Sequence, residues 1–415
     1  MRILFLTQVL PYPLDAGPKI RAYYVLRHLA QTHQVTLVSF VRQTDTPEAI
    51  GHLKSFCKAV HTARMPRGRL RDIGHVVKSM VSNQPFLIVR DQVEPMKALL
   101  AEMVEQHGPF DAVHSDQLWM ASYALFARQQ STPGAIPLTI LDKHNAVYLV
   151  PKRLLANERN PLMQLLMRME TRKMLRYEVE TCNRFDHVTW VTEDDYTALS
   201  GAAPSGKAVP NSAVIPICGE AEDDSTIVPK PLARRVTFIG GLHYPPNAQG
   251  ISWYAQHIFP LVYQAIPDAI LTIIGKDPPK SLSELDIPDK NLEIAGYVDE
   301  LQPYLEETAV FIVPLLAGGG MRVKILDAWR WQLPVVSTTI GAEGLQITPH
   351  ENILLADTPV DFAQATIHLI QNRSLAREIA EAGRRQFERG YSWRTAYRRW
   401  NKIYPAIDGQ KSLYP

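Results

Sequence analysis

The sequence predicts an α/β protein of two doubly wound parallel-sheet domains with a central cleft between them, and three observations lead to this prediction. The chain has 415 residues, which suits two domains of about 200 residues each better than one core. Short β-rich apolar runs alternate with longer helical stretches, as they do in parallel βαβ units. The alternation then restarts after a segment rich in proline, glycine and serine, residues 200–212.

The apolar runs give the expected strands. In the first half they are residues 2–8, 34–40, 111–116, 137–145 and 187–195. In the second half they are residues 234–242, 269–275, 292–298, 310–316, 334–339 and 352–357. Several are apolar throughout, which is typical of strands covered by helices on both faces. We expect an N-terminal domain over 1–205 and a C-terminal domain over 206–395, with ligands at the carboxyl ends of the strands.

Composition and charge exclude several classes of protein. The net charge is only +2, so no overall field favours nucleic acid. The three cysteines, Cys57, Cys182 and Cys218, have no metal-binding or CxxC spacing, and we expect buried free thiols in a reducing compartment. No apolar run reaches the roughly 18 residues of a membrane-spanning helix, and no cleavage site follows the first run. We therefore expect a cytoplasmic protein whose membrane contact, if any, is peripheral.

The strongest chemical signal follows the run at 310–316. Three consecutive glycines allow the backbone to approach a ligand closely, and the helix start after them favours an anion. Arg322 and Lys324 place two cations in the first helical turn, where they oppose the helix dipole; a bound diphosphate would explain both. Asp327 lies one turn after Lys324 and is placed to accept hydrogen bonds from a ribose. The candidate donor-binding residues of this segment are Gly318, Gly319, Gly320, Met321 and Asp327.

Other strand ends in the second half carry glycines as well. Gly240 and Gly241 follow the run at 234–242, and Gly275 and Gly296 lie at the ends of two more runs. One such glycine is usually a turn residue, and a glycine-rich turn with solvent-facing charges is the alternative interpretation of the whole segment. Four glycine-bearing strand ends in one half-sheet favour a crevice left open for a nucleotide.

Residues from about 234 to 400 resemble the donor domain of glycosyltransferase family 4 (glycosyl transferases group 1), which are retaining enzymes of the GT-B fold. The resemblance rests on FIGGLHYPPN, LTIIGKDP, AGYVDEL, VPLLAGGGMRVKILDAW, LPVVSTTIGAEGL and the final YSW. It implies that Tyr297 and Val298 lie against the base, and that residues 396–415 cross back to the N-terminal domain. Two positions depart from the family: Gly319 stands where many members have a sugar-contacting glutamate, and Asp327 replaces a second glutamate.

In the N-terminal half, the resemblance implies that Gly17 allows donor and acceptor to approach closely, and that His144 contacts the transferred sugar. Asn145, which follows His144, is a candidate residue on the acceptor side. His114 and Asp116, after another strand, are weaker candidates for the same side. Arg21 has two open interpretations, a phosphate ligand or a solvated helix charge.

Two basic stretches also have two open interpretations. Residues 64–78 contain five cations and one acid, and residues 152–176 contain seven cations and two acids with apolar residues between them. Such helices either lie on an anionic membrane or pack an apolar stripe on the protein's own surface.

The function we expect is therefore a retaining hexosyltransferase. It would move a sugar from a UDP- or GDP-linked donor to a hydroxyl acceptor, which could be lipid-linked, a saccharide or a small molecule. His144, Arg322 and Lys324 are the expected catalytic residues, and no metal or other cofactor is expected because no DxD-type carboxylate cluster is present. The alternatives are a nucleotide-sugar epimerase or a catalytically weak partner subunit. An oxidoreductase is disfavoured because no GxGxxG follows the first strand.

Overall fold

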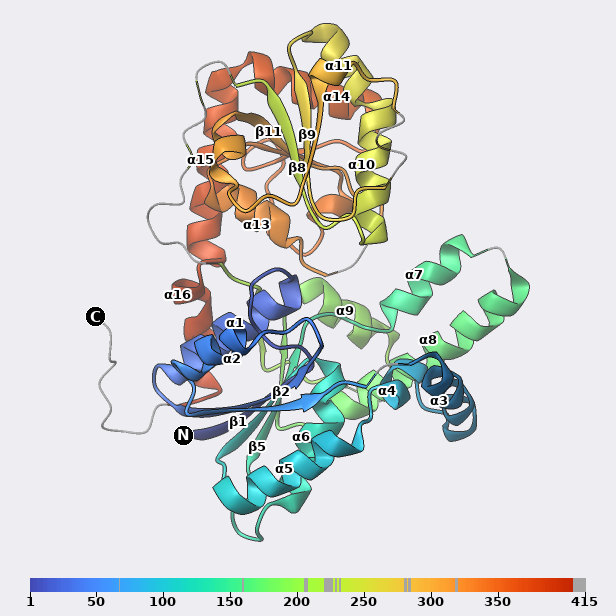
Figure 1. Ribbon diagram of the computed structural model, residues 1–415, viewed down its shortest axis with the longest axis vertical. Coiled ribbons are helices and arrows are strands. Elements are labelled where there is room, and N and C mark those ends of the chain that lie inside the picture. The colour runs from blue at the N-terminus through green and yellow to red at the C-terminus, as the bar shows by residue number, and fades with distance from the viewer. Residues whose placement is uncertain are drawn as a thin grey trace. The chain divides into compact units, whose positions relative to one another are not determined.

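The computed structural model describes residues 1–66, 68–158, 160–204, 208–219, 227, 230, 233–279, 282, 285–317 and 320–405. The chain divides into two units. The first consists of Met1–Ile217 together with Ala396–Pro415, and the second of Cys218–Thr395. Each unit is built around one parallel sheet, and the two are described in turn (Figure 1).

The first unit contains a seven-stranded sheet in the order β3-β2-β1-β4-β5-β6-β7. Its strands are β1 (Arg2–Thr7), β2 (Gln34–Val41), β3 (Ala59–Arg64), β4 (Ala112–Asp116), β5 (Leu138–Lys143), β6 (His187–Trp190) and β7 (Ala213–Val214). Every pairing between these strands is parallel. The chain runs outward from β1 to β3 and returns on the other side of β1 at β4, so the topological switch point lies between β1 and β4.

Helices cover both faces of this first sheet. They are α1 (Gly17–Ala30), α2 (Pro47–Lys54), α3 (Arg69–Ser82), α4 (Phe86–Arg90), α5 (Glu94–His107), η1 (Leu118–Met120), α6 (Ala121–Gln130), α7 (Leu149–Asn157), α8 (Pro161–Cys182) and α9 (Glu193–Ala202). In Figure 1, α1 and α2 lie on one side of the strands and α5 and α6 on the other. This double cover explains why β1 is buried along almost its whole length.

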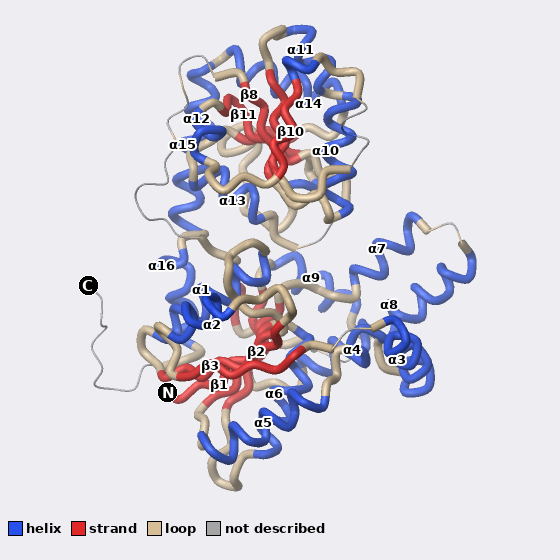
Figure 2. Tube along the Cα trace, in the orientation of Figure 1, coloured by secondary structure: helices blue, strands red, loops and turns tan. Residues whose placement is uncertain are grey.

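The second unit contains a six-stranded sheet in the order β10-β9-β8-β11-β12-β13. Its strands are β8 (Arg235–Ile239), β9 (Ile270–Ile274), β10 (Leu292–Gly296), β11 (Thr308–Val313), β12 (Val335–Ser337) and β13 (Leu354–Leu355). Its helices are α10 (Pro245–His257), α11 (Phe259–Ala265), η4 (Asp289–Asn291), α12 (Gln302–Glu306), α13 (Val323–Arg330), η5 (Ile340–Ala342), α14 (Pro359–Gln371), α15 (Arg373–Gly390) and α16 (Trp393–Ala396). The switch point lies between β8 and β11, and helices flank the strands on both sides (Figure 2).

Close helix packing fixes α13, the helix that follows the predicted glycine segment. Trp329 of α13 is fully buried, and its indole nitrogen donates to the carbonyl of Asn352 at 3.0 Å. A Cβ on Gly383 of α15 would lie only 2.4 Å from Trp329 Cδ1. Glycine at this position therefore allows α15 to pack directly on α13.

The predicted fold of two doubly wound parallel-sheet domains is confirmed. The first unit reaches beyond residue 205, to Ile217, because β7 pairs with β6 through Thr189 and Ala213. The predicted strand at 187–195 ends earlier, at Trp190, because Thr192 caps α9 by accepting from the amide of Asp195.

The last described residues, 396–405, group with the first unit. They contain η6 (Tyr397–Lys402). Arg399 donates to the carbonyl of Val214 at 2.6 Å, and Asn401 bonds His28 of α1 at 3.0 Å. The segment is thus fastened to two elements of the first unit.

The three cysteines are free and buried, as predicted. Burial raises the pKa of the Cys57 thiol to about 12 and that of Cys182 to about 11, so neither is a reactive thiolate at neutral pH. Within the described part of the chain, no helix combines the length and apolar character needed to cross a membrane.

Candidate functional site

In the second unit, the carboxyl ends of β8 and β11 bring together the residues that the sequence singled out. Gly240 comes directly after β8. A Cβ on Gly240 would lie 2.9 Å from Lys324 Nζ and 3.0 Å from Asn247 Nδ2. The missing side chain therefore lets a lysine of α13 and an asparagine of α10 meet at the end of β8, beside the switch point of the sheet.

The positive charge of Lys324 is met by neutral groups. Its ammonium donates to Asn247 Oδ1 at 2.7 Å and lies 4.6 Å from the centre of the Phe238 ring. Burial, followed by the positive charge of Arg322, lowers the pKa of Lys324 to about 7. Among the described residues, no carboxylate forms an ion pair with Lys324. A half-buried ammonium with neutral partners and a second cation nearby is an environment suited to an anionic ligand.

Arg322 stands at the start of α13 and is 6% exposed. Its Nε and Nη2 donate to the carbonyl of Ile340 at 3.2 and 3.1 Å, and Nη2 lies 3.6 Å from a carboxylate oxygen of Glu343. These contacts hold the guanidinium beside the first turn of α13. The two predicted cations therefore both lie at this end of the helix, where its amide groups also favour negative charge.

The glycine segment is described from Gly320 onward. Gly318 and Gly319 lie outside the described residues, so their predicted donor contacts remain predictions. Gly320 has a φ of +75°, a left-handed conformation that glycine adopts without strain. Met321, which follows it, is buried.

The side chain of Asp327, the predicted ribose ligand, is 40% exposed. Its Oδ1 lies 3.6 Å from Nη2 of Arg330. Partial burial raises the pKa of Asp327, and the positive charge of Arg330 opposes the shift. Its role toward a ribose stays a prediction.

The predicted base platform lies at the ends of β9 and β10. Gly296 ends β10 with a φ of +67°, and the Tyr297 side chain that follows is 64% exposed. Lys276 Nζ, which follows β9, lies 4.4 Å from the centre of the Tyr297 ring. Val298 is half-buried. An exposed ring backed by a cation offers a flat surface for stacking, and contact with a base stays a prediction.

In the first unit, the ends of β4 and β5 hold a buried network of charges. Arg21 of α1 is fully buried and donates to both oxygens of Asp142, at 3.0 and 2.7 Å. It also donates to the carbonyls of Ile215 and Pro216 at 2.5 and 2.6 Å. Both sequence interpretations of Arg21, a phosphate ligand and a solvated charge, are therefore wrong: the guanidinium neutralises Asp142 inside the protein.

Burial alone would raise the pKa of Asp142, but the charge and hydrogen bonds of Arg21 lower it to about 2. The carboxylate therefore stays ionised at neutral pH. Thr189 of β6 donates to it as well, at 2.9 Å. This pairing satisfies both buried charges, so the network is compatible with a stable core.

His114 belongs to the same network. It is fully buried, and its Nδ1 lies 2.8 Å from the hydroxyl of Tyr404, a residue near the end of the chain. Burial lowers the pKa of His114 to about 4, against the opposing effect of Asp142 and Asp116, so the ring is neutral at pH 7. The predicted acceptor contact of His114 is wrong for this structure, because no part of the side chain reaches solvent.

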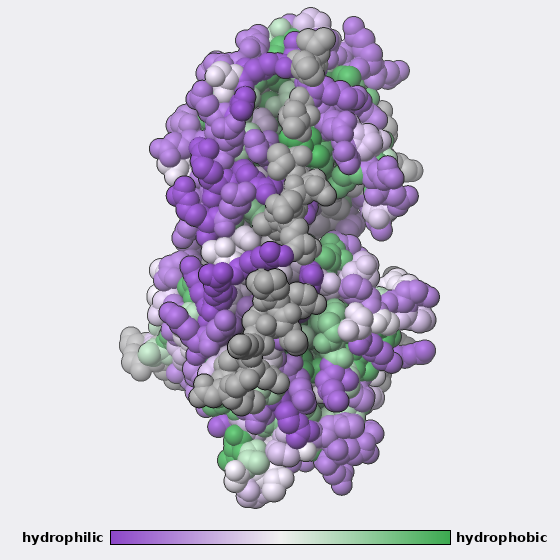
Figure 3. Space-filling view, turned by 90° about the vertical axis from the view of Figure 1, so that its left-hand side faces the viewer, coloured by the Kyte–Doolittle hydropathy of each residue, from purple (hydrophilic) through white to green (hydrophobic). Residues whose placement is uncertain are grey.

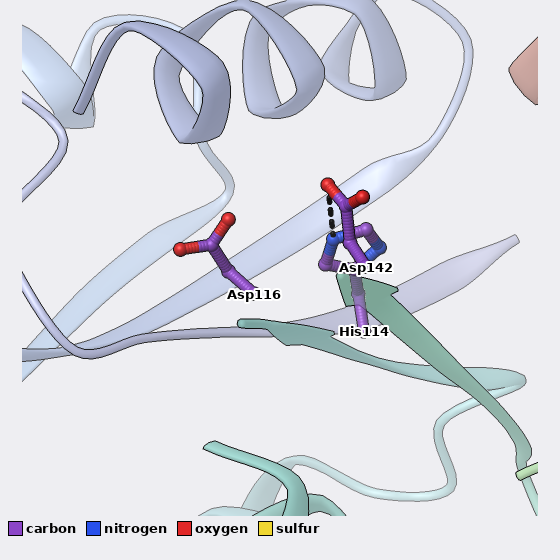
Figure 4. A group of neighbouring side chains, drawn as sticks. All are labelled: His114, Asp116 and Asp142. Atoms are coloured by element: carbon purple, nitrogen blue, oxygen red, sulfur yellow. Dashed lines mark ion pairs between the residues drawn. The ribbon is translucent and has the colours of Figure 1, made fainter. Parts of the chain in front are cut away.

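His114, Asp116 and Asp142 could also be considered as metal ligands, since one atom of each lies within 4.8 Å of the others. In Figure 4, Asp142 lies close to His114 and Asp116 lies to one side. The residues do not fit a cation. Asp142 already holds the Arg21 guanidinium with both oxygens, and that positive charge would repel a metal ion.

His144, which follows β5, differs from His114 because its ring is only partly enclosed. The side chain is 9% exposed, and Nε2 lies 2.8 Å from Asp116 Oδ1 and 3.9 Å from Asp142 Oδ2. An ionised carboxylate only accepts, so Nε2 carries the proton. Nδ1 is buried and has no hydrogen-bond partner among the described residues. The Asp116 contact thus orients the ring and leaves Nδ1 as a buried nitrogen without a partner.

Two further predicted residues lie near these elements. Asn145 follows His144 and is half-buried, and Gly17 is the first residue of α1. The sequence did not single out Asn247 and Lys276, although both lie within motif strings that carry the family resemblance. No local sequence pattern pointed to Tyr404, because its partner His114 is 290 positions away in the chain.

Comparison with known proteins defines the class of the second unit. Residues 233–372, about a third of the chain, match the family model for glycosyl transferases group 1. The second unit therefore contains a glycosyl transferases group 1 domain, and the two-unit fold is the GT-B fold of glycosyltransferases.

Individual proteins extend the likeness to most of the chain. An uncharacterised 44.6 kDa protein in the cps region of Klebsiella pneumoniae is 27% identical over 388 residues, covering 91% of this chain and 93% of that protein. Anabaena HepE, solved in complex with UDP and glucose, is 13% identical with a TM-score of 0.66, covering 98% of this chain and all of that one. Sucrose-phosphate synthase of Thermosynechococcus elongatus is 18% identical with a TM-score of 0.67, covering 97% and 98%.

Proposed function

We propose that the protein is a retaining glycosyltransferase of family 4, which moves a hexose from a UDP- or GDP-linked donor to a hydroxyl acceptor. The observation that carries this proposal is Lys324. It is a half-buried cation without an acidic partner among the described residues, held under Gly240 at the switch point of a glycosyl transferases group 1 domain.

The donor diphosphate would lie at the start of α13. Lys324, Arg322 and the first amides of the helix would stabilise the charge that develops as the sugar–phosphate bond breaks, which is electrostatic catalysis. We propose no metal, because these two cations supply the positive charge that a metal ion would otherwise provide. Tyr297 and Val298 would hold the base and Asp327 the ribose. The complexes of Anabaena HepE with UDP and glucose support this choice of donor.

His144 would contact the transferred sugar with its ring oriented by the contact between Nε2 and Asp116. Nδ1 is buried, so a sugar hydroxyl would donate to it after a small movement of the side chains that cover it. The acceptor is a lipid-linked, saccharide or small-molecule alcohol, and the configuration of the sugar is retained, as the resemblance to family 4 implies. The buried free thiols support a reducing, cytoplasmic setting.

The test is donor turnover. Purified protein is given UDP- and GDP-linked hexoses with a panel of saccharide and lipid-linked alcohols, and release of the nucleoside diphosphate is measured with and without acceptor. We expect release of the nucleoside diphosphate to depend on the acceptor, and the turnover rate of R322A/K324A to be lower by about 10²-fold or more. NMR of the product should show the anomeric configuration of the donor.

Two outcomes would contradict the proposal. Conversion of the donor sugar without any acceptor would indicate an epimerase, and tight nucleotide binding without turnover would indicate a partner subunit. Near-normal turnover by R322A/K324A would show that Arg322 and Lys324 do not have the proposed roles. The proteins compared above give neither alternative any support.

A further inference from the structure

Three helices of the first unit, α3, α7 and α8, expose an unusual number of large apolar side chains. More than half of the exposed large apolar residues in the described part of the chain lie on them. They are Val76, Val77, Met80, Val81, Val150, Leu154, Leu162, Met163, Leu165 and Met169. Scattered exposed apolar residues need no explanation, but a cluster on neighbouring helices indicates an interaction surface.

The helices are joined into one structural element, which we call the α3/α7/α8 surface. α7 and α8 form a hairpin that projects from the unit, with α3 beside α8 (Figure 1). Lys173 in the middle of α8 donates to the carbonyl of Ser79 on α3 at 3.0 Å, and Arg176 donates to the carbonyl of Asn83 at 2.9 Å. Polar contacts therefore fix α3 against α8 while the apolar side chains remain exposed.

The exposed side chains are not the packing stripe of an ordinary surface helix. Only the second half of α8 packs on the core, through residues such as Met174, Val179 and Cys182. Its first half exposes Leu162 at 65% and Leu165 at 55%. The sequence interpretation of 152–176 as a helix that packs its apolar residues on the protein therefore holds only for the second half of α8.

The exposed charged side chains on the same helices are almost all positive. Their exposed cations are Lys78, Lys152, Arg153, Arg168, Arg172 and Arg176. Among their described side chains, Glu180 is the one acid that is exposed to the same degree. By contrast, the face of the molecule in Figure 3 is mainly hydrophilic, with small separated apolar areas. Leucine, valine and methionine interleaved with lysine and arginine match the interface of a bilayer that carries anionic headgroups.

We propose that the α3/α7/α8 surface docks the protein peripherally on an anionic phospholipid bilayer. The apolar side chains would enter the boundary between headgroups and acyl chains, and the flanking cations would lie among the phosphates. A neutral protein partner would satisfy the apolar residues but would present no negative charge to this positively charged surface, and a second copy docking through the same surface would bring like charges together. The inference does not depend on the transfer reaction, because vesicle binding is measured without donor or acceptor.

The experiment is flotation of the full chain with vesicles of phosphatidylcholine alone or with 30% phosphatidylglycerol. We expect binding to the anionic vesicles at least tenfold stronger than to neutral ones, weakening as salt is raised. The variant Leu154→Glu/Leu162→Glu/Leu165→Glu should lose at least tenfold in binding. The matched control Ile136→Glu/Leu261→Glu/Val360→Glu changes exposed apolar residues elsewhere and should bind as the unchanged protein does.

A second measurement separates insertion from simple charge attraction. Tryptophan fluorescence of Leu162→Trp should be quenched by vesicles that contain brominated acyl chains, beyond the quenching of the unchanged protein, whereas Leu261→Trp should show no such increase. Equal binding of the two triple variants with unchanged circular dichroism would overturn the proposal. So would a concentration-dependent dimer that only the α3/α7/α8 variant dissociates, because the surface would then cover a second copy.

Discussion

At the scale of single residues, local sequence patterns predicted the position of Arg322 and Lys324 better than the surroundings of Arg21 and His114. Arg322 and Lys324 oppose the dipole of their own helix, and that local conflict favours a site for an anion, which stays a prediction. The fold adds Asn247 and Gly240, which hold Lys324 in place. Arg21 could not be predicted in the same way, because its partner Asp142 is 121 positions away.

Lys324 should make nucleotide binding depend on pH. Its pKa is about 7 in the free protein, and a bound diphosphate stabilises the charged form and so raises that pKa. Above pH 7 the free side chain is increasingly neutral, so binding takes up a proton. We expect the affinity for UDP or GDP to fall by up to about tenfold per unit between pH 7 and pH 8.5. Calorimetry at several pH values measures the effect.

A matched pair of variants tests the assignment of this pH dependence to Lys324. Lys324→Met should bind the nucleotide weakly and with no pH dependence in this range. Lys290→Met, which changes an exposed lysine of η4, should keep the slope of the unchanged protein. An unaltered slope in Lys324→Met would show that another group takes up the proton.

Asp116 should act as a positioning residue for His144. Asp116→Asn keeps the shape of the side chain but can donate to Nε2, which favours the other tautomer and places the proton on Nδ1. We expect kcat to fall about 10²-fold, with donor KM changed little, because the diphosphate site is in the other unit. Steady-state kinetics with varied donor separates the two constants. A rise in KM alone would argue against this role.

At the scale of elements, the apolar runs predicted most of the strands, and the misses have a physical cause. The structure adds β3 and β7, which lie at the two edges of the first sheet. The edge strand β3 is buried at only two of its six residues, so it lacks the continuous apolar run that marks a central strand. The basic stretch at 152–176 predicted helices, but periodicity alone did not show that their apolar residues would be exposed.

The packing of α15 on α13 fixes the helix that carries Lys324 and the proposed donor site. Gly383→Ala adds a Cβ 2.4 Å from Trp329 Cδ1, and we expect overpacking to lower the free energy of unfolding by about 1–3 kcal/mol. Gly390→Ala, at the last residue of the same helix, meets only a glutamine side-chain atom at 3.8 Å and should cost little. Urea unfolding of both variants measures the difference. Equal stabilities would contradict the close contact between the helices.

At the scale of the whole molecule, the division into two units followed from one observation, the restart of the βαβ pattern. The position of the boundary did not, because the short strand β7 lies beyond the glycine- and proline-rich segment. The contacts of the last residues with the first unit join parts of the chain that no local pattern relates, such as His114 and Tyr404. Apolar periodicity predicted what lies near in sequence, whereas the buried polar network depends on pairs that only the folded chain brings together.

The central claim is that the second unit binds the diphosphate of a sugar nucleotide through the start of α13. Calorimetric titration of the full chain with UDP, GDP, ADP and dTDP tests it most directly, using R322A/K324A beside the Lys290→Met control. We predict one-site binding of UDP or GDP to the unchanged protein and the control, with affinity at least tenfold weaker in the double variant. Equal affinity in the double variant, or no binding of any of the four nucleotides, would contradict the claim.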